Sequence, residues 1–366
     1  MNKSMIRYLL AKLLLIEAML LCVPIVVALL NLKNDFVVKD SPTVFISLFA
    51  TIAILLILGG IGTLFKPKDF HIYAKEGVLI VALCWILWSF FGALPFVFSG
   101  QIPNIIDAFF EVSSGFTTTG ATILNDVSVL SPSLLFWRSF THLIGGMGVL
   151  VFALAIMDNN KNSHLEVMKA EVPGPVFGKI VSKLKNTAQI LYYLYLALFF
   201  LFVIIYFCAG MPLYDSFIIA MGTAGTGGFT VFNDGIAHYH STLITYLVSF
   251  GVLVFGVNFN LYYYIMLRKF KAFFGDEELR TYLMIVGVSS LLIACNILHL
   301  YHNFADSFEM SFFQVSNVIT TTGFGFGNTV DWPLFSQFLL LMLMVIGGSA
   351  GSTAGGLKVI RFLILA

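Results

Sequence analysis

The sequence predicts an all-α membrane protein that crosses the bilayer several times. Hydrophobic residues make up 59% of its 366 residues and charged residues only 11%, about half the charged fraction of an ordinary soluble domain. The chain contains eight apolar runs, each long enough to cross a bilayer, which takes roughly 20 residues. A short Thr-Gly string also occurs three times between these runs, as an internal repeat.

The apolar runs follow one another along the whole chain. They lie near residues 8–30, 44–65, 77–98, 133–157, 187–209, 241–267, 279–301 and 334–364. The first run is too long for a signal-peptide core and has no small-residue cleavage site before Asn31, so we expect a retained helix. The four cysteines lie singly within apolar runs, which favours core filling over a disulfide framework or a zinc site.

Lys and Arg gather in one set of connecting segments. These are the N-terminus and residues 66–75, 161–185 and 268–280. Residues 99–137, 210–241 and 302–337 contain neither Lys nor Arg and carry Asp and Glu instead. Because positively charged loops stay in the cytoplasm, we expect the N-terminus and the basic segments to be cytoplasmic and the acidic stretches to face outward. The net charge of +1 gives no indication of nucleic acid binding.

The repeat appears when Gly120, Gly228 and Gly323, here called the anchor glycines, are aligned. The aligned strings are FFEVSSGFTTTG, GTAGTGGFTVFND and FFQVSNVITTTG, and an Asn follows five positions after each anchor glycine. Each copy comprises an apolar span, a semi-apolar segment of about a dozen residues, a polar stretch and a second apolar span. A dozen residues are too few to cross a bilayer as a helix, so each short segment is predicted to enter from outside and return to the same side.

Non-helical backbone at membrane depth must be buried in protein or line a watery path, because hydrocarbon offers no hydrogen-bond partners. Glycine reaches backbone angles that are closed to other residues, which lets successive carbonyl groups point the same way. Such carbonyls, together with threonine hydroxyls, can replace the hydration shell of a monovalent cation. The acidic outer stretches would concentrate cations there. Three copies of the string favour a cation path over the alternative that Thr-Gly strings only loosen or pack helices.

The last apolar run is interrupted by GGSAGSTAGG, residues 347–356, here called the glycine-rich segment. It holds five glycines, each costing about 1 kcal/mol in a helix interior, so the helix is predicted to break or bend. We expect a gate below the ion-coordinating loops, formed by Gly347, Gly348, Ser349, Ala350, Gly351, Ser352, Thr353, Ala354, Gly355 and Gly356. Tight helix packing is the alternative. The shorter strings at 144–148 and 255–259 are interpreted as ordinary small-residue helix contacts.

The strings SSGFTTTGAT, GTGGFTVFND, ITTTGFGFGN and IGGSAGSTAGGLKVIR closely resemble the TrkH/KtrB superfamily of potassium uptake channels, and two extra N-terminal spans favour its TrkH branch. The resemblance implies potassium uptake across the bacterial cytoplasmic membrane, through four helix, pore-loop, helix units around a pseudo-fourfold ion path. The implied filter residues are Thr117, Thr118, Thr119, Gly120, Gly225, Thr226, Gly227, Gly228, Thr320, Thr321, Thr322 and Gly323. Glycine at the anchors is typical of potassium-selective members, whereas serine in the first unit marks sodium-carrying relatives.

The resemblance also implies a homodimer in the lipid membrane and a cytosolic nucleotide-binding regulator of the TrkA type, with K⁺ as the transported ion and no cofactor in this chain. We expect an N-terminal helix pair at residues 1–70 and pore units at 71–160, 161–270 and 271–366. Because the sequence ends at Ala366, a fourth unit is expected downstream of it.

Other functions stay open. A membrane enzyme would need a nucleophile with a base, or a metal pair, at membrane depth, but the histidines are scattered, most of them near the span ends, without a His-Glu-x-x-His pattern. An accessory, non-conducting subunit and a sodium-permeable relative are further alternatives. Arg138 is expected to contact Glu111 or Asp126 rather than to line a pore, because a fixed cation would repel the permeant ion.

Overall fold

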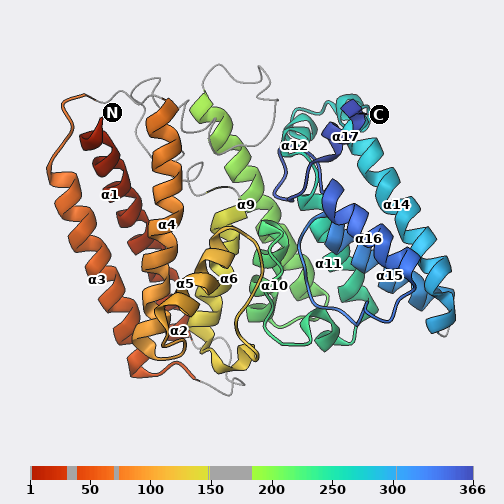
Figure 1. Cartoon of the computed structure of the whole chain (residues 1–366), viewed down its shortest axis with the longest axis horizontal. Coiled ribbons are helices and arrows are strands. Elements are labelled where there is room, and N and C mark those ends of the chain that lie inside the picture. The colour runs from red at the N-terminus through yellow and green to blue at the C-terminus, as the bar shows by residue number, and fades with distance from the viewer. Residues whose placement is uncertain are drawn as a thin grey trace. The chain divides into compact units, whose positions relative to one another are not determined.

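The computed structural model describes residues 2–30, 39–69, 74–146, 148, 184–301 and 303–365. Within these ranges all regular secondary structure is helical, as predicted. The chain divides into two compact units, Met1–Tyr192 and Tyr193–Ala366, whose helices are drawn in Figure 1.

The first unit combines long apolar helices with shorter ones. Its elements are α1 (Lys3–Leu20), α2 (Cys22–Leu30), α3 (Pro42–Leu64), α4 (Ala74–Ser99), α5 (Ile105–Phe116), the 3₁₀ turn η1 (Val127–Val129) and α6 (Pro132–Gly146). Helices α1 and α3 pack closely, because a Cβ added at Gly62 would lie 2.4 Å from the Cβ of Ala11.

Helix α5 is the first of the short segments predicted to return to one side of the membrane. It begins where the Asn104 side chain accepts a hydrogen bond from the backbone N of Ile106 at 3.0 Å, a cap that satisfies a free N–H of the first turn. It ends at Phe116, whose ring lies between those of Trp88 and Trp137, at centroid distances of 5.5 and 6.1 Å. These aromatic contacts fix the end of α5 within the core of the first unit.

The second unit contains two more short helices of the same kind, α10 and α15. Its elements are α9 (Leu184–Cys208), which holds the boundary between the units, α10 (Leu213–Gly225), η2 (Gly235–Tyr239), α11 (Thr242–Phe255), α12 (Phe259–Met266), α13 (Phe270–Phe274), α14 (Glu277–Ile297), η3 (Leu298–Leu300), α15 (Phe304–Ile319), α16 (Leu334–Ile346) and α17 (Val359–Leu365). The core between α14 and α15 includes Tyr282, Val315 and Ile319, all fully buried. Helices α5, α10 and α15 have 12, 13 and 16 residues, consistent with the predicted short segments.

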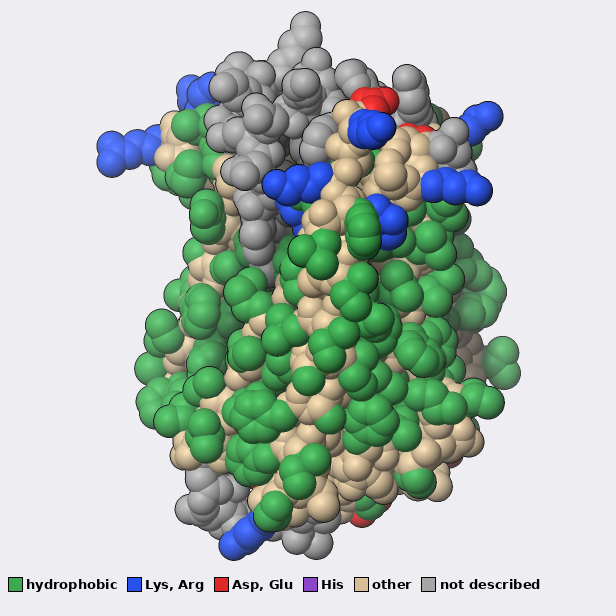
Figure 2. Space-filling model, turned by 90° about the vertical axis from the view of Figure 1, so that its left-hand side faces the viewer, with side chains coloured by type: hydrophobic (Ala, Val, Ile, Leu, Met, Phe, Trp, Pro, Cys, Tyr) green, Lys and Arg blue, Asp and Glu red, His purple; other side chains and the backbone are tan. Residues whose placement is uncertain are grey.

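Five helical stretches in the described ranges are long and apolar enough to cross a membrane. They are Lys3–Leu30, Pro42–Leu64, Lys75–Ser99, Gln189–Cys208 and Glu277–Leu300. The apolar face drawn in Figure 2 has Lys and Arg gathered mostly at the end where α1 begins. On α3, Ile46, Phe49 and Ile57 are exposed. Such a broad exposed apolar surface is suited to lipid contact, and the chain is an all-α, multi-pass membrane protein.

The remaining apolar runs are not simple spans. The expected span 241–267 is wrong as one straight helix, since α11 and α12 meet at 92°. The string 255–259 therefore holds a sharp bend rather than an ordinary helix contact, and Asn258 begins α12 by accepting from the backbone N of Asn260 at 3.0 Å. The break predicted in 334–364 is confirmed, because α16 ends at Ile346 and α17 begins at Val359. Helix α6 ends at Gly146, and nearly all of the expected span beyond it lies outside the described residues.

Candidate functional site

The three Thr-Gly loops share one backbone conformation. Two residues before each anchor glycine stands a threonine in the left-handed region, namely Thr118, Thr226 and Thr321 with φ of 54°, 50° and 55°. The anchor glycines have φ of 74°, 81° and 80° in the same order. Left-handed backbone is common for glycine but costs energy for a β-branched residue. The same costly residue type therefore stands at the same place in all three loops.

Each turn is closed by the hydrogen bonds that end many helices. In the first loop the backbone N of Thr119 donates to the O of Ser114 at 2.9 Å. Gly227 and Thr322 make the equivalent bonds five residues back, also at 2.9 Å. This is the Schellman arrangement, in which the left-handed position is usually glycine. The sequence alignment found these segments, but it did not predict that a threonine would occupy the left-handed position.

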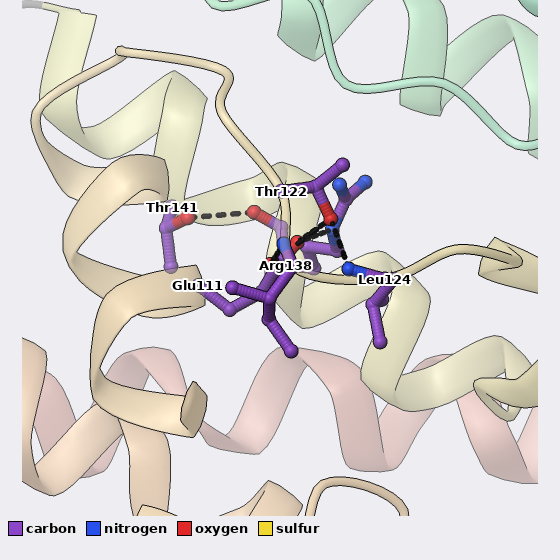
Figure 3. Close-up of polar contacts among 6 residues, drawn as sticks. Glu111, Thr122, Leu124, Arg138 and Thr141 are labelled. Carbon is purple, nitrogen blue, oxygen red and sulfur yellow. Dashed lines mark hydrogen bonds and ion pairs between the residues drawn. The ribbon is translucent and has the colours of Figure 1, made fainter. Parts of the chain in front are cut away.

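Behind the first loop lies a buried ion pair, shown in Figure 3. Glu111 is 0% exposed and Arg138 is 2% exposed, and the Arg138 Nε lies 2.6 Å from a Glu111 carboxylate oxygen. The other carboxylate oxygen accepts from the backbone N of Ile123 at 3.0 Å, and the Thr122 hydroxyl donates to the same carboxylate at 2.8 Å. The expected contact of Arg138 with Glu111 is confirmed. Asp126 instead caps η1 through the backbone N of Ser128 at 2.9 Å.

The third loop is stabilised by neutral side chains. Gln314 stands at the position of Glu111 relative to the anchor glycine, and its Nε2 donates to the O of Phe326 at 2.6 Å. Asn317 binds both backbone groups of Phe324, accepting from its N at 2.9 Å and donating to its O at 2.6 Å. The first and third loops therefore both have residues just beyond the anchor glycine hydrogen-bonded to the short helix.

The second loop has Ile219 at the corresponding position and packs against the third loop instead. The backbone N of Ile236 donates to the O of Gly325 at 2.9 Å. A Cβ added at Gly228 would lie 2.2 Å from the O of Thr322. Glycine is therefore required at this anchor by close backbone approach as well as by its positive φ.

The acidic residues near the loops differ in exposure. Asp126, Asp234 and Asp331 are exposed, as an acidic outer surface requires. Glu111 and Asp215 are buried and therefore lie inside the units rather than on that surface. Asp215 accepts a hydrogen bond from the Tyr239 hydroxyl at 3.2 Å. Burial, with the neighbouring Asp215 charge, raises the pKa of Tyr239, which keeps this phenol a hydrogen-bond donor.

The glycine-rich segment folds back on itself between α16 and α17. Gly347, Gly351 and Gly356 have positive φ of 76°, 70° and 82°. A Cβ added at Gly356 would lie 2.4 Å from the Cα of Gly347, so the two ends of the segment cross in contact. The backbone N of Val359 donates to the O of Gly348 at 3.1 Å, which closes the crossing.

Two of the left-handed threonines contact this segment directly. The Thr226 hydroxyl donates to the O of Thr353 at 3.0 Å. The Thr321 hydroxyl accepts from the backbone N of Gly355 at 2.7 Å. These contacts explain what a threonine offers at the left-handed position that glycine does not, since glycine has no hydroxyl. They join the second and third loops to the glycine-rich segment, a contact that sequence spacing does not reveal.

Comparison with known proteins gives consistent matches. The TrkH family model, described as a cation transport protein, matches residues 44–366. The Trk system potassium uptake protein TrkH of Salmonella typhimurium is 38% identical over 301 residues, which cover 80% of this chain and 62% of that protein. The Trk system potassium uptake protein TrkH of Halomonas elongata is 30% identical over 377 residues, which cover 100% of this chain and 75% of that protein. The chain thus spans less than two thirds of the Salmonella relative.

A solved structure has the same fold. The crystal structure of the potassium transporter TrkH from Vibrio parahaemolyticus matches with a TM-score of 0.86 and 30% identity, over 100% of this chain and 74% of that one. The family match covers most of the chain and the structural match covers all of it. The chain therefore belongs to the TrkH family of cation transport proteins.

Proposed function

We propose that this chain forms part of the pore of a potassium uptake protein in the bacterial cytoplasmic membrane. A cation transport family is not a family of enzymes, and the matched relatives carry the names of potassium uptake proteins. The observation that carries the proposal is the turn shared by three loops, in which a left-handed threonine is followed two residues later by a left-handed glycine.

The filter residues of this proposal are residues 117–120, 225–228 and 320–323. Left-handed residues at alternate positions let successive carbonyl groups point to one side of the strand, where together they can replace the water around an alkali ion. The short helices α5 and α15 end immediately before the filter residues and α10 ends at the first of them, Gly225. The partial negative charge of a helix C-terminus favours a cation. Potassium is the proposed ion, because the family resemblance associates glycine at the anchors with potassium and the matched relatives are named potassium uptake proteins.

The glycine-rich segment, residues 347–356, is the gate. Its support is direct contact with Thr226 and Thr321, since a segment bonded to the filter strands lies where it can obstruct an ion leaving them. Replacing residues 349–354 with alanine in the full-length protein should change potassium flux and its dependence on the regulator. Unaltered flux and regulation would favour a packing role instead.

The wider assembly is part of the proposal, and it is supported by the family resemblance and by the charge distribution. The N-terminus and basic segments face the cytoplasm, in keeping with the concentration of Lys and Arg at one end in Figure 2. The pore units lie at residues 71–160, 161–270 and 271–366, after the helix pair of residues 1–70. The protein works as a homodimer in lipid, regulated by a cytosolic nucleotide-binding protein of the TrkA type.

Growth of a potassium-uptake-deficient bacterium at low potassium tests the proposal. The complete gene should restore growth, and Gly120→Ser should weaken selectivity for potassium over sodium. Gly100→Ser is a matched control, because Gly100 also has a positive φ, 76°, lies outside the filter, and has open space around an added Cβ. If growth is still restored after all three Thr-Gly strings are disrupted, the chain is better explained as an accessory subunit. If the unsubstituted protein takes up sodium and potassium equally, it is better explained as a sodium-permeable relative.

A further inference from the structure

The glycine-rich segment is also held from its other side, by Glu278 in the first turn of α14. Glu278 is 6% exposed. One of its carboxylate oxygens accepts from the backbone N of Ala350 at 2.7 Å and from the backbone N of Ile360 at 3.2 Å. Ala350 lies within the glycine-rich segment and Ile360 lies in the first turn of α17. A single carboxylate oxygen of Glu278 therefore joins the segment to the start of α17.

These bonds satisfy groups that have few other partners. The backbone N of Ile360 belongs to the first turn of α17, where N–H groups have no acceptor within the helix. A buried amide left without an acceptor is costly, and bonds to a charged group are stronger than neutral ones. Lys358 is 7% exposed, donates to the O of Ala354 and also attracts the Glu278 carboxylate. Glu278 and Lys358 therefore both stabilise the folded-back conformation of the glycine-rich segment where it leads into α17.

Glu278 is joined rigidly to the residues that precede α14. The Asp276 side chain caps α14 by accepting from the backbone N of Leu279 at 2.8 Å. Arg280 donates back to the O of Gly275 at 2.5 Å. Figure 1 shows α12, α17 and the beginning of α14 at the same end of the second unit. Movement of the stretch 268–276 would therefore carry the Glu278 carboxylate with it.

We propose that Glu278 is the positioning residue that holds the glycine-rich segment against the second and third loops and joins it to the stretch 268–276. The position of the segment is set from both sides: threonine hydroxyls bind it from the loops, and Glu278 binds it from α14. The consequence for transport rests on the proposed gating function, but the positioning role does not.

Thiol labelling of the segment measures the positioning role without any measurement of transport. The full-length protein, with its native cysteines replaced and Ser352→Cys introduced, is purified in detergent and reacted with a maleimide. Glu278→Ala should raise the labelling rate about tenfold or more, because loss of bonds to a charged group shifts a local equilibrium by that much. Glu277→Ala is the matched control, since Glu277 is the exposed neighbour, and it should leave the rate unchanged. Glu278→Gln, which keeps an acceptor oxygen but loses the charge, should give a labelling rate between those of Glu278→Ala and the parent.

An unchanged labelling rate in a folded Glu278→Ala protein would overturn the inference. If that variant does not fold, Glu278→Asp serves instead, because its carboxylate is withdrawn by one methylene. It should raise labelling in the same direction by a smaller factor, and an unchanged rate would equally overturn the inference. Potassium flux measured on the same variants separates the two proposals. Raised labelling with unaltered flux supports the role of Glu278 and counts against the segment as a gate.

Discussion

The first and third loops adopt the same turn, yet different chemistry stabilises them. In the first loop the carboxylate of Glu111 accepts from the backbone N of Ile123 and is paired with Arg138. In the third loop the amide of Gln314 donates to the O of Phe326, and no charge is required. Both side chains stand at the same position before the anchor glycine and bind the residue three positions after it. The common requirement is thus a hydrogen bond to that residue, whereas donor, acceptor and charge can vary.

The two solutions differ in their consequences for stability. A buried ion pair costs desolvation of both partners, and removal of one partner leaves the other charge uncompensated. Neutral amides carry a smaller desolvation penalty. Loss of one costs its hydrogen bond and leaves one neutral polar group without a partner. The first loop should therefore be more sensitive to single substitutions than the third.

The largest expected effect is that of Arg138→Met. It leaves the Glu111 carboxylate buried without its cation, which should destabilise the protein by about 3–5 kcal/mol. The midpoint of thermal unfolding in detergent measures this. The double variant Glu111→Gln with Arg138→Met should recover part of the loss, because the remaining group is neutral. A single variant as stable as the parent would show that the ion pair is not what stabilises the first loop.

A smaller effect is expected for Asn317→Ala in the third loop. It removes both bonds to Phe324 and should cost about 2 kcal/mol in the same unfolding measurement. Gln314→Ala removes the single bond to Phe326 and should cost about 1 kcal/mol. A loss at Gln314 as large as that at Arg138 would contradict the distinction drawn between charged and neutral stabilisation.

An effect as small as that of Gln314→Ala is expected for the hydroxyl of Thr321. Thr321→Val keeps the branched shape but removes the acceptor for the backbone N of Gly355, and it should cost about 1 kcal/mol. Thr321→Ser keeps the hydroxyl and should be nearly neutral. Maleimide labelling of the Ser352→Cys protein tests the loss of this hydrogen bond directly. The labelling rate should rise with Thr321→Val and stay unchanged with Thr321→Ser. Equal behaviour of the two variants would show that the hydroxyl does not hold the segment.

Much of the fold could be predicted from local patterns. Apolar runs of sufficient length gave the long helices, and the repeat around the anchor glycines gave the three short helices with their turns. The break between Ile346 and Val359 followed from glycine content. An acidic partner for Arg138 was also predictable, since a cation within an apolar run needs one, but the sequence left Glu111 and Asp126 as alternatives.

The features that could not be predicted depend on contacts between distant segments. The left-handed conformations of Thr226 and Thr321 are unfavourable by local preference and become understandable only through their bonds to residues 353 and 355. The bonds of Glu278 join residues separated by 72 and 82 positions, with no pattern that links them. The bend after Phe255 was missed because FGVNF is apolar enough to continue a helix.

That bend has a partner elsewhere in the chain. It frees the O of Gly256, which accepts from the backbone N of Ser349, and the backbone N of Phe259, which donates to the O of Gly351, each at 3.0 Å. The break between α11 and α12 and the break between α16 and α17 thus provide hydrogen-bond partners for each other's backbone groups. Hydrocarbon would offer these groups no partner. A chimera in which only one of the two breaks is replaced by that of a relative with a different geometry should not fold correctly, unless the other break is replaced as well. Residues 255–259 and 347–356 are therefore best exchanged as a single cassette.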